Sequence, residues 1–440
     1  MINIKGFIKR TKISCVFTPA SAATLTYIER PLVENIFTKE LEIRGKQIIL
    51  YGMSGSGKTT MIRHLMKKMN RPYVYTQCMV GMTMEDILKS AFDKLDRYYI
   101  SQKSCRSGIS LSSELKNEFL SVKSNVSSED SATQTRVIAP QLTPERLAKF
   151  LGEIGALWVI EDFHKVSMDV RIQIAGILKT FIGLADDYEN VRIICIGAVG
   201  KASELLQIEP NLNNRVSQIE VPLLDNREVE SIIEKGSRIL NVVMADNLKQ
   251  KICYYSHNLG SLVHQMCYDI CYKNGIKKAC FLTKRLDESK FIDVIESHIS
   301  SQSDSFRTLY EYITKERVAW YILKTMVEKG RTKISSYEII SGINYKSNRY
   351  SETEILNKLQ ALCDGDNCVI RYDENAEKYM FSTPFWEAFL RMQFSVEKKH
   401  INNARKRRKN KKLLFKNQDD IDAQIYAAIL RIYGDKLKDK

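Results

Sequence analysis

The sequence has no hydrophobic run long enough to cross a lipid bilayer. Its longest apolar stretch, residues 193–199, reaches seven residues only if Gly197 is included, whereas a membrane helix needs roughly 18 to 20. The first 22 residues carry lysines and small residues as signal peptides do, but their apolar centre is short and contains Ser14. A cytoplasmic protein without a membrane segment is therefore expected.

Cysteine, proline and glycine are too few or too scattered to indicate a special class of protein. The ten cysteines form no C-x-x-C pair, which argues against a disulfide framework and a zinc site. Cys267 and Cys271 share a predicted helix face with His264, so a metal site there is the alternative to buried thiols. With 8 prolines, 20 glycines and 44% hydrophobic residues among 440, a globular protein of two or three domains is expected.

Acidic residues are absent from the segment that carries most of the net charge. Between residues 398 and 416 there are ten Lys or Arg and no Asp or Glu, against a net charge of +15 for the whole chain. An electrostatic site therefore belongs to this segment and not to the domain surfaces. A flexible basic arm can bind nucleic acid without sequence preference by releasing phosphate counterions. A solvated linker is the alternative.

Short apolar runs alternate with helical patterns in the first half of the chain. They are residues 47–51, 73–78, 156–160 and 191–196. Strands that alternate with helices predict a parallel sheet covered on both faces, so an α/β fold is expected.

The first of these runs leads into the motif G-x-x-x-x-G-K-[ST], at residues 52–59. Small residues there let backbone N–H groups converge on phosphate oxygens at a helix N-terminus, while Lys58 neutralises the β and γ phosphates and the Thr59 hydroxyl binds Mg²⁺. The motif predicts a P-loop NTPase. The phosphate-binding residues expected are Gly52, Ser54, Gly55, Ser56, Gly57, Lys58, Thr59 and Thr60.

Two carboxylates follow the apolar run 156–160. A phosphate site needs one acid for the metal and, for hydrolysis, a second group to orient water. We assign Glu161 to the metal shell with Thr59 and Asp162 to the water, and the opposite assignment stays open. His164 either relays a proton, contacts the γ-phosphate region or packs locally.

Arg215 follows the last predicted core strand of the sheet. In ring-forming ATPases a residue on this segment reaches the γ-phosphate of a neighbouring subunit. Arg215 is therefore predicted to be catalytic in a homo-oligomer, with a surface or interdomain salt bridge as the alternative.

Taken in order, the segments GMSGSGKTT, WVIEDFHKV, IICIGAVGKASEL and NNRVSQIEVPLLD resemble AAA+ ATPases over residues 16–300. The similarity is to bacterial members with an I-E-D-F-H Walker B motif and, more distantly, to origin-recognition-type initiators, transposition helper ATPases and STAND ATPases. It implies ATP and Mg²⁺ held between a core and a helical lid, with Tyr27, Ile28 and Arg30 at the adenine pocket. No N-K-x-D motif specifies guanine, so ATP is preferred to GTP.

Two positions depart from the family pattern. Gly200 occupies the place of the first sensor, with Lys201 next to it, and no arginine occupies the second sensor, where His264 and Gln265 are the nearby polar residues. Both departures argue against fast, initiator-like hydrolysis.

The second half of the chain is predicted to be mainly helical, and residues 301–396 combine three helices with a β-hairpin as winged-helix domains do. The candidate recognition helix, 352–364, carries Glu352, Glu354 and Asp364 against one Lys358, which disfavours reading of the major groove. A protein-binding or lid-regulating module is the alternative.

The sequence patterns together predict six segments. They are 1–45, contributing to the nucleotide pocket; 46–222, the ATPase core, with a serine-rich insertion at 101–137; 223–300, the lid; 301–396, the winged helix; 397–416, a basic linker; and 417–440, a final helix.

The function expected from these observations is slow ATP hydrolysis that drives a conformational or assembly switch. One alternative is a nucleotide-gated scaffold with little turnover that recruits an unidentified protein partner. Another is a DNA-linked ATPase of the transposition or replication type, bound to nucleic acid through residues 398–416.

Overall fold

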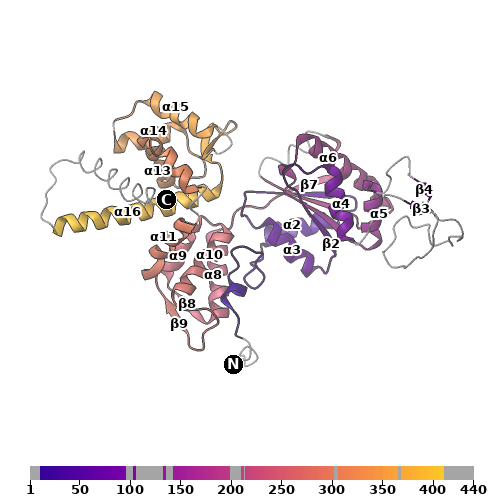
Figure 1. Cartoon of the computed structure of the whole chain (residues 1–440), viewed down its shortest axis with the longest axis horizontal. Helices are drawn as coiled ribbons and strands as arrows, with labels where there is room; N and C mark the ends of the chain where they lie inside the picture. The colour runs from indigo at the N-terminus through magenta and orange to yellow at the C-terminus, as the bar shows by residue number, and fades with distance from the viewer. Residues whose placement is uncertain are drawn as a thin grey trace. The chain divides into compact units, whose positions relative to one another are not determined.

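The computed structural model describes residues 10–95, 103–105, 132–134, 142–198, 210–212, 214–301, 306–347, 349–364 and 368–410. The chain divides into two compact units. One comprises residues 21–224, and the other combines residues 1–20 with 225–440 (Figure 1). Within the described segments, no helix combines the length and the apolar character that a membrane span requires.

The unit of residues 21–224 is built on a five-stranded parallel sheet, which confirms the predicted α/β fold. The strand order is β2-β5-β6-β1-β7. The strands are β1 Gln47–Tyr51, β2 Tyr73–Gln77, β5 Leu157–Glu161, β6 Ile193–Gly197 and β7 Val216–Glu220. Tyr51 at the end of β1 pairs with Gly197 on one side and Glu220 on the other. All five strands therefore end at the same edge of the sheet.

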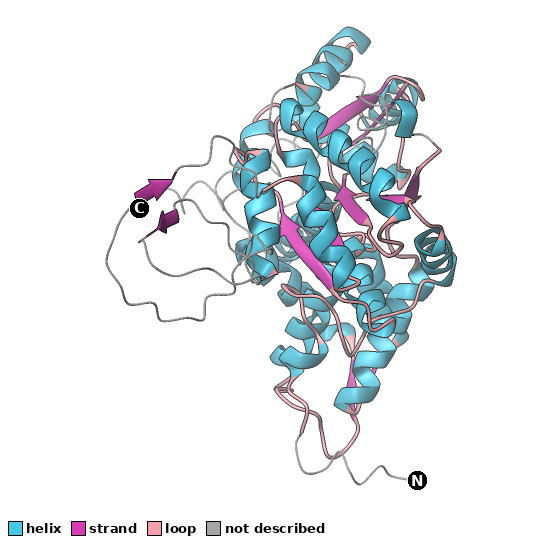
Figure 2. Cartoon of the chain, turned by 90° about the vertical axis from the view of Figure 1, so that its right-hand side faces the viewer, coloured by secondary structure: helices cyan, strands magenta, loops and turns pink. Residues whose placement is uncertain are grey.

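Helices cover both faces of this sheet because its strands alternate their side chains between two cores (Figure 2). Ile48 and Leu50 face a core shared with α2 (Pro31–Glu42) and α3 (Lys58–Lys68). Ile49 and Trp158 face the other core. That core is shared with α4 (Met84–Lys94), α5 (Pro144–Glu153) and α6 (Met168–Gly183). Within the insertion, β3 (Lys103–Cys105) and β4 (Ala132–Gln134) pair antiparallel.

The first residues of the chain group with the helices beyond residue 225, so the expected segment 1–45 is divided between the two units. Phe17 is fully buried, and a Cβ added to Gly236 would lie 2.3 Å from its ring. The backbone N–H of Thr18 donates to Nδ1 of His264 at 2.9 Å. The elements involved are α1 Ile13–Val16, α8 Asn226–Leu240, α9 Asp246–Ser256, α10 Gly260–Lys273 and α11 Phe291–Ser301, with the short pair β8 Val242–Met244 and β9 Lys284–Leu286.

The chain beyond residue 305 contains the helices and the hairpin that the winged-helix prediction requires, in the predicted order. They are α12 Thr308–Ile313, α13 Arg317–Lys329, α14 Ser336–Lys346, α15 Glu352–Cys363, β10 Ile370–Asp373, β11 Lys378–Phe381 and α16 Pro384–Asn410. β10 and β11 are antiparallel, with Ile370 opposite Phe381. The assignment as a winged helix stays a prediction.

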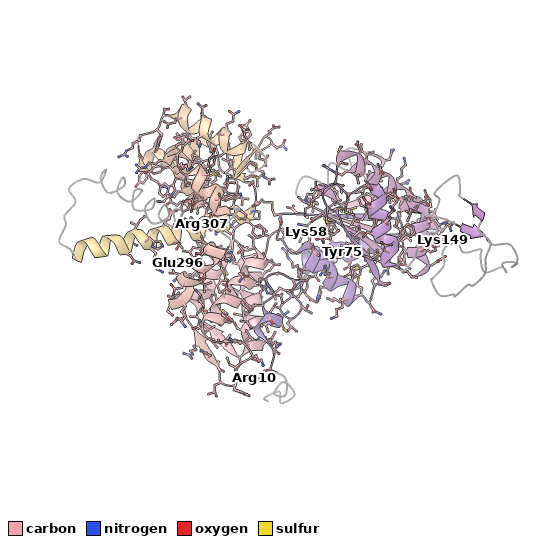
Figure 3. The ribbon with its side chains drawn as sticks, viewed as in Figure 1. Arg10, Lys58, Tyr75, Lys149, Glu296 and Arg307 are labelled. Carbon is pink, nitrogen blue, oxygen red and sulfur yellow. The ribbon has the colours of Figure 1, made fainter. Side chains whose placement is uncertain are left out.

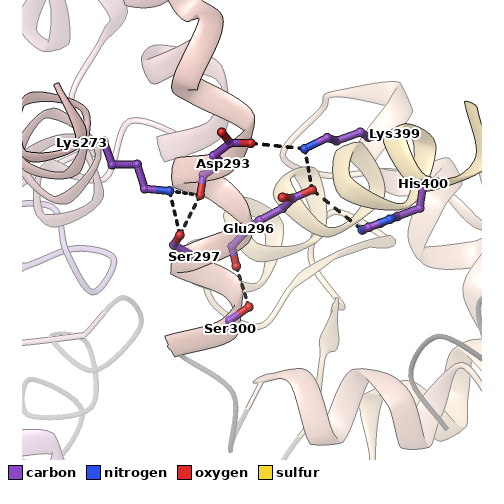
Figure 4. A network of polar contacts seen from close by, with 7 residues as sticks. All are labelled: Lys273, Asp293, Glu296, Ser297, Ser300, Lys399 and His400. Atoms are coloured by element: carbon purple, nitrogen blue, oxygen red, sulfur yellow. Dashed lines mark hydrogen bonds and ion pairs between the residues drawn. The ribbon is translucent and has the colours of Figure 1, made fainter. Parts of the chain in front are cut away.

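The expected basic linker is wrong in its first part, because α16 continues through Asn410. No Pro or Gly interrupts this stretch, and Val396 and Glu397 are still buried. Lys399 then bonds to Glu296 of α11 at 2.9 Å and approaches Asp293 at 3.4 Å (Figure 4). The remainder of the basic segment, 411–416, and the predicted final helix lie outside the described residues.

Candidate functional site

The glycine-rich motif forms the loop between β1 and α3, as the sequence predicts. Gly55 and Gly57 have positive φ angles of 82° and 89°, and Gly57 is the N-cap of α3. No atom lies within 4 Å of a Cβ added to Gly57, so its backbone conformation and not space requires glycine there. The loop therefore places N–H groups at the N-terminus of an 11-residue helix, where anions bind favourably.

Gly52 needs to be glycine for a different reason. Its φ is 155°, and an added Cβ would lie 2.3 Å from the carbonyl oxygen of Val221. We expect Gly52→Ala to lower the free energy of unfolding by about 3 kcal/mol or more, because the close contact with backbone atoms adds to the backbone strain. Gly81→Ala is the matched control: φ is 85° and no atom lies within 4 Å, so only backbone strain of roughly 1–2 kcal/mol remains. Equal losses in urea unfolding would show that the contact with Val221 is unimportant.

Lys58 lies at the first position of α3 (Figure 3). Its Nζ donates to the carbonyl oxygens of Gly52 and Met53, both at 2.9 Å. Burial lowers the pKa of Lys58, while the charges of Asp162 and Glu161 oppose this shift. The ammonium group is thus held over the loop by two neutral carbonyl oxygens. A bound phosphate could take their place, and its charged oxygens would form stronger hydrogen bonds.

Thr59 and Glu161 are brought together, although 102 positions separate them in the sequence. Glu161 is the last residue of β5, and the Thr59 hydroxyl donates to its Oε1. Burial raises the pKa of Glu161 above its usual range, while the Thr59 hydrogen bond acts in the opposite direction. A hydroxyl and a carboxylate oxygen are ligands that suit Mg²⁺, so the donor atoms fit the ion that the sequence predicts.

Asp162 is oriented differently from Glu161. Its backbone is left-handed, with φ 58°, and it precedes the 3-10 turn Phe163–Lys165. Its Oδ2 forms an ion pair with Nζ of Lys165 at 2.6 Å. Only Glu161 contacts Thr59, which supports Glu161 as the metal residue and leaves Asp162 as the candidate that orients water. His164 lies in the same turn, and its role stays a prediction.

The residues proposed for the adenine pocket lie beside the loop. Arg30 is 8% exposed, and its guanidinium donates to Ser56 O at 3.2 Å, Pro222 O at 2.9 Å and Leu223 O at 3.2 Å. The Tyr27 ring stacks on His64 of α3 with centroids 3.9 Å apart. Arg30 therefore ties the phosphate loop to the chain that follows β7. The sequence analysis did not single out His64 or the contacts of Arg30 with the loop, because no sequence motif marks either of them.

Arg215 is exposed and immediately precedes β7. Its carbonyl accepts from the N–H of Gln47 at 3.0 Å, so it lies where β1 begins, whereas the phosphate loop follows the end of β1. The length of β1, roughly 16 Å, therefore separates Arg215 from the phosphate loop of the same chain. A catalytic Arg215 would therefore have to act on another copy of the chain.

The candidate sensor residues are only partly described. Gly200 and Lys201 lie outside the described residues. His264 is 4% exposed and accepts from Thr18, and burial lowers its pKa to about 4, so it is a neutral structural acceptor.

The cysteines near His264 are buried. Burial raises the pKa of Cys271 to about 12, and no group of potential metal ligands occurs in the described part of the chain. These are the properties of core thiols.

A family model described as an AAA domain matches residues 44–206. This match includes the phosphate loop, Glu161 and Asp162, and confirms the resemblance to AAA+ ATPases for this segment. The match supports nucleotide binding as the general function of the segment. No curated protein matches the chain.

Several solved structures match the chain at low sequence identity and with TM-scores below 0.5. A Walker-type ATPase of Pyrococcus abyssi is 14% identical, covers 84% of this chain and 100% of its own, and has a TM-score of 0.47. Cdc6p of Pyrobaculum aerophilum is 13% identical, with 88% and 98% covered and a TM-score of 0.42. The Thermotoga maritima RuvB Holliday junction branch migration motor is 12% identical, with 84% and 97% covered and a TM-score of 0.39.

Proposed function

We propose that this chain binds ATP with Mg²⁺ at the loop 52–59 and hydrolyses it slowly, and that hydrolysis drives a conformational or assembly switch. One observation carries the proposal. Glu161, at the end of β5, contacts Thr59 at the start of α3, directly beside the half-buried Lys58. A phosphate loop, a cation and a metal-binding oxygen pair thus meet at one edge of the sheet.

Each residue has a separate part in this proposal. The loop N–H groups and Lys58 bind the phosphates, and Arg30 keeps the loop in position through Ser56 O. Thr59 and Glu161 would hold Mg²⁺, which supplies positive charge next to the phosphate oxygens. Asp162 would accept a proton from the attacking water, once its carboxylate is free of Lys165.

A nucleotide-gated scaffold is the second candidate, and the ion pair of Asp162 favours it. The 2.6 Å contact with Lys165 occupies the carboxylate that would orient water. His264, at the expected second-sensor region, is buried and bound to Thr18. Both features favour slow turnover over fast turnover, and a protein partner would then respond to the bound nucleotide itself.

The described residues give less support to nucleic acid as a partner. The cations near the candidate recognition helix are engaged: Lys358 pairs with Glu316 at 2.8 Å and Lys346 with Glu328. Lys399, at the start of the basic segment, pairs with Glu296. Binding to DNA would therefore rest on the cations beyond residue 403. A homo-oligomer remains part of the proposal through Arg215.

Calorimetric titration of the full-length protein with ATP, with and without Mg²⁺, tests the proposal. We expect heat on ATP addition, tighter binding with Mg²⁺, and weaker binding of GTP. Phosphate release measured on the same sample then separates the two candidates: turnover above the uncatalysed rate supports the ATPase, and binding without turnover supports the scaffold. Absence of heat with both nucleotides would exclude both.

A further inference from the structure

A cavity of about 300 Å³ lies in the unit of residues 21–224, at the edge of the sheet opposite the phosphate loop. Thr38 and Leu41 of α2 line it, together with Met69 and Arg71 after α3 and Asn190 and Arg192 before β6. Arg192 directly precedes β6 and Arg71 lies two residues before β2. The cavity therefore lies where these strands begin, whereas the phosphate loop lies where β1 ends.

Arg192 is a buried cation without a carboxylate partner among the described residues. Its side chain is 2% exposed and donates only to backbone carbonyls, to Glu189 O at 2.7 Å, Val191 O at 2.8 Å and Ile43 O at 3.0 Å. Its Nε is buried and has no hydrogen-bond partner in the part of the chain that the structure describes. Burial of a charge is unfavourable unless an opposite charge or a full set of hydrogen bonds compensates it.

Arg71 brings a second guanidinium to the same cavity. It donates to Oδ1 of Asn190 at 2.6 Å, and its Nε is also buried without a partner. Burial, with smaller contributions from the charges of Arg71 and Arg44, lowers the pKa of Arg192 to about 10, and the charge of Glu189 opposes this shift. Two guanidinium groups therefore meet at this cavity, and the carboxylates of Glu42 and Glu189 also line it.

We propose that this cavity binds a small anion that carries a single phosphate group. Guanidinium groups bind phosphate oxygens with several N–H donors at once, and Asn190 and Thr38 line the same cavity. Leu41 and Met69 form an apolar wall that suits the uncharged part of a phosphate monoester.

The size and the remaining charges of the cavity set the class of ligand. A volume of about 300 Å³ is at the lower limit for small-molecule pockets. Glu42 and Glu189 also line it, so polyphosphates with charge spread over a longer chain are disfavoured. The ligand is therefore either inorganic phosphate or a small phosphate monoester.

Calorimetry on the full-length Lys58→Ala variant tests this site with binding at the phosphate loop strongly weakened. The probes are inorganic phosphate, glycerol 3-phosphate and citrate at equal ionic strength. We expect both phosphates to bind and citrate not to bind. Tighter binding of glycerol 3-phosphate assigns the site to a monoester, and equal binding assigns it to free phosphate.

Substitutions locate the binding. Arg71→Gln in the same background should weaken phosphate affinity about tenfold or more, because hydrogen bonds to a charged group are lost. Thr38→Tyr, which fills the cavity and keeps both arginines, should weaken it similarly. Arg44→Gln is the matched control, because Arg44 pairs with Asp186 and does not line the cavity; we expect less than about a threefold change.

No heat with either phosphate would overturn the proposal, as would unchanged affinity in Arg71→Gln and Thr38→Tyr or equal binding of citrate. Circular dichroism of each variant shows that lost binding does not reflect unfolding. Since these measurements use a variant whose nucleotide site is already weakened, failure here leaves the proposed ATP binding of the unmodified protein untouched.

Discussion

Replacing Lys58 by alanine is expected to weaken ATP binding about a hundredfold or more. The half-buried ammonium group donates to Gly52 O and Met53 O, and these hydrogen bonds would be exchanged for bonds to charged phosphate oxygens. Hydrogen bonds to charged groups contribute about 1.5–3 kcal/mol each. Isothermal titration calorimetry of the variant measures the change.

Lys68→Ala is the matched control for this prediction. Lys68 is the last residue of the same helix, and its amine pairs with Glu29 at the surface at 2.7 Å. We expect its ATP affinity to equal that of the unmodified protein. Affinity retained within about threefold in Lys58→Ala would contradict the assignment of the loop as a phosphate site.

The two acids after β5 are expected to respond differently to neutralisation. Glu161→Gln should weaken Mg²⁺-dependent ATP binding, because Glu161 contacts Thr59. Asp162→Asn should keep that affinity and lower the rate of hydrolysis by about 10²–10⁴-fold, the usual contribution of a general base. Measuring affinity with and without Mg²⁺ alongside phosphate release separates the two effects, and the reverse pattern would exchange the roles.

Lys165→Ala provides a control for Asp162 and tests the ion pair directly. It removes the 2.6 Å contact and leaves both acids in place, so turnover should be unchanged or higher. A turnover reduced as strongly as in Asp162→Asn would show that the ion pair itself is required.

The affinity for Mg²⁺ is expected to depend on pH through Glu161. Burial raises the pKa of this carboxyl group, so it takes up a proton at a higher pH than an ordinary glutamate does. Mg²⁺ affinity should therefore begin to fall at a higher pH as the solution is made more acidic.

Local patterns in the sequence predicted the elements that carry the proposed chemistry. The run 47–51 followed by glycines indicated a strand, a phosphate loop and a helix, and β1, the loop and α3 occupy these positions. An apolar run ending in two acids predicted β5 with Glu161 at its end. These predictions succeed because they depend on residues close together in the sequence. The spacing of apolar residues, the φ angles that glycine allows and the start of a helix are all set within a few residues.

Only the tertiary structure decided how distant segments meet. Arg30 reaches Ser56 and Pro222, His264 accepts from Thr18, and Arg71 and Arg192 converge on one cavity. Strand order and side-chain burial determine these contacts, and no local pattern records either. The continuation of α16 through Asn410 also depends on contacts between distant segments. The run of charges by itself predicted a linker, but Val396 and Glu397 are buried and Lys399 pairs with another helix.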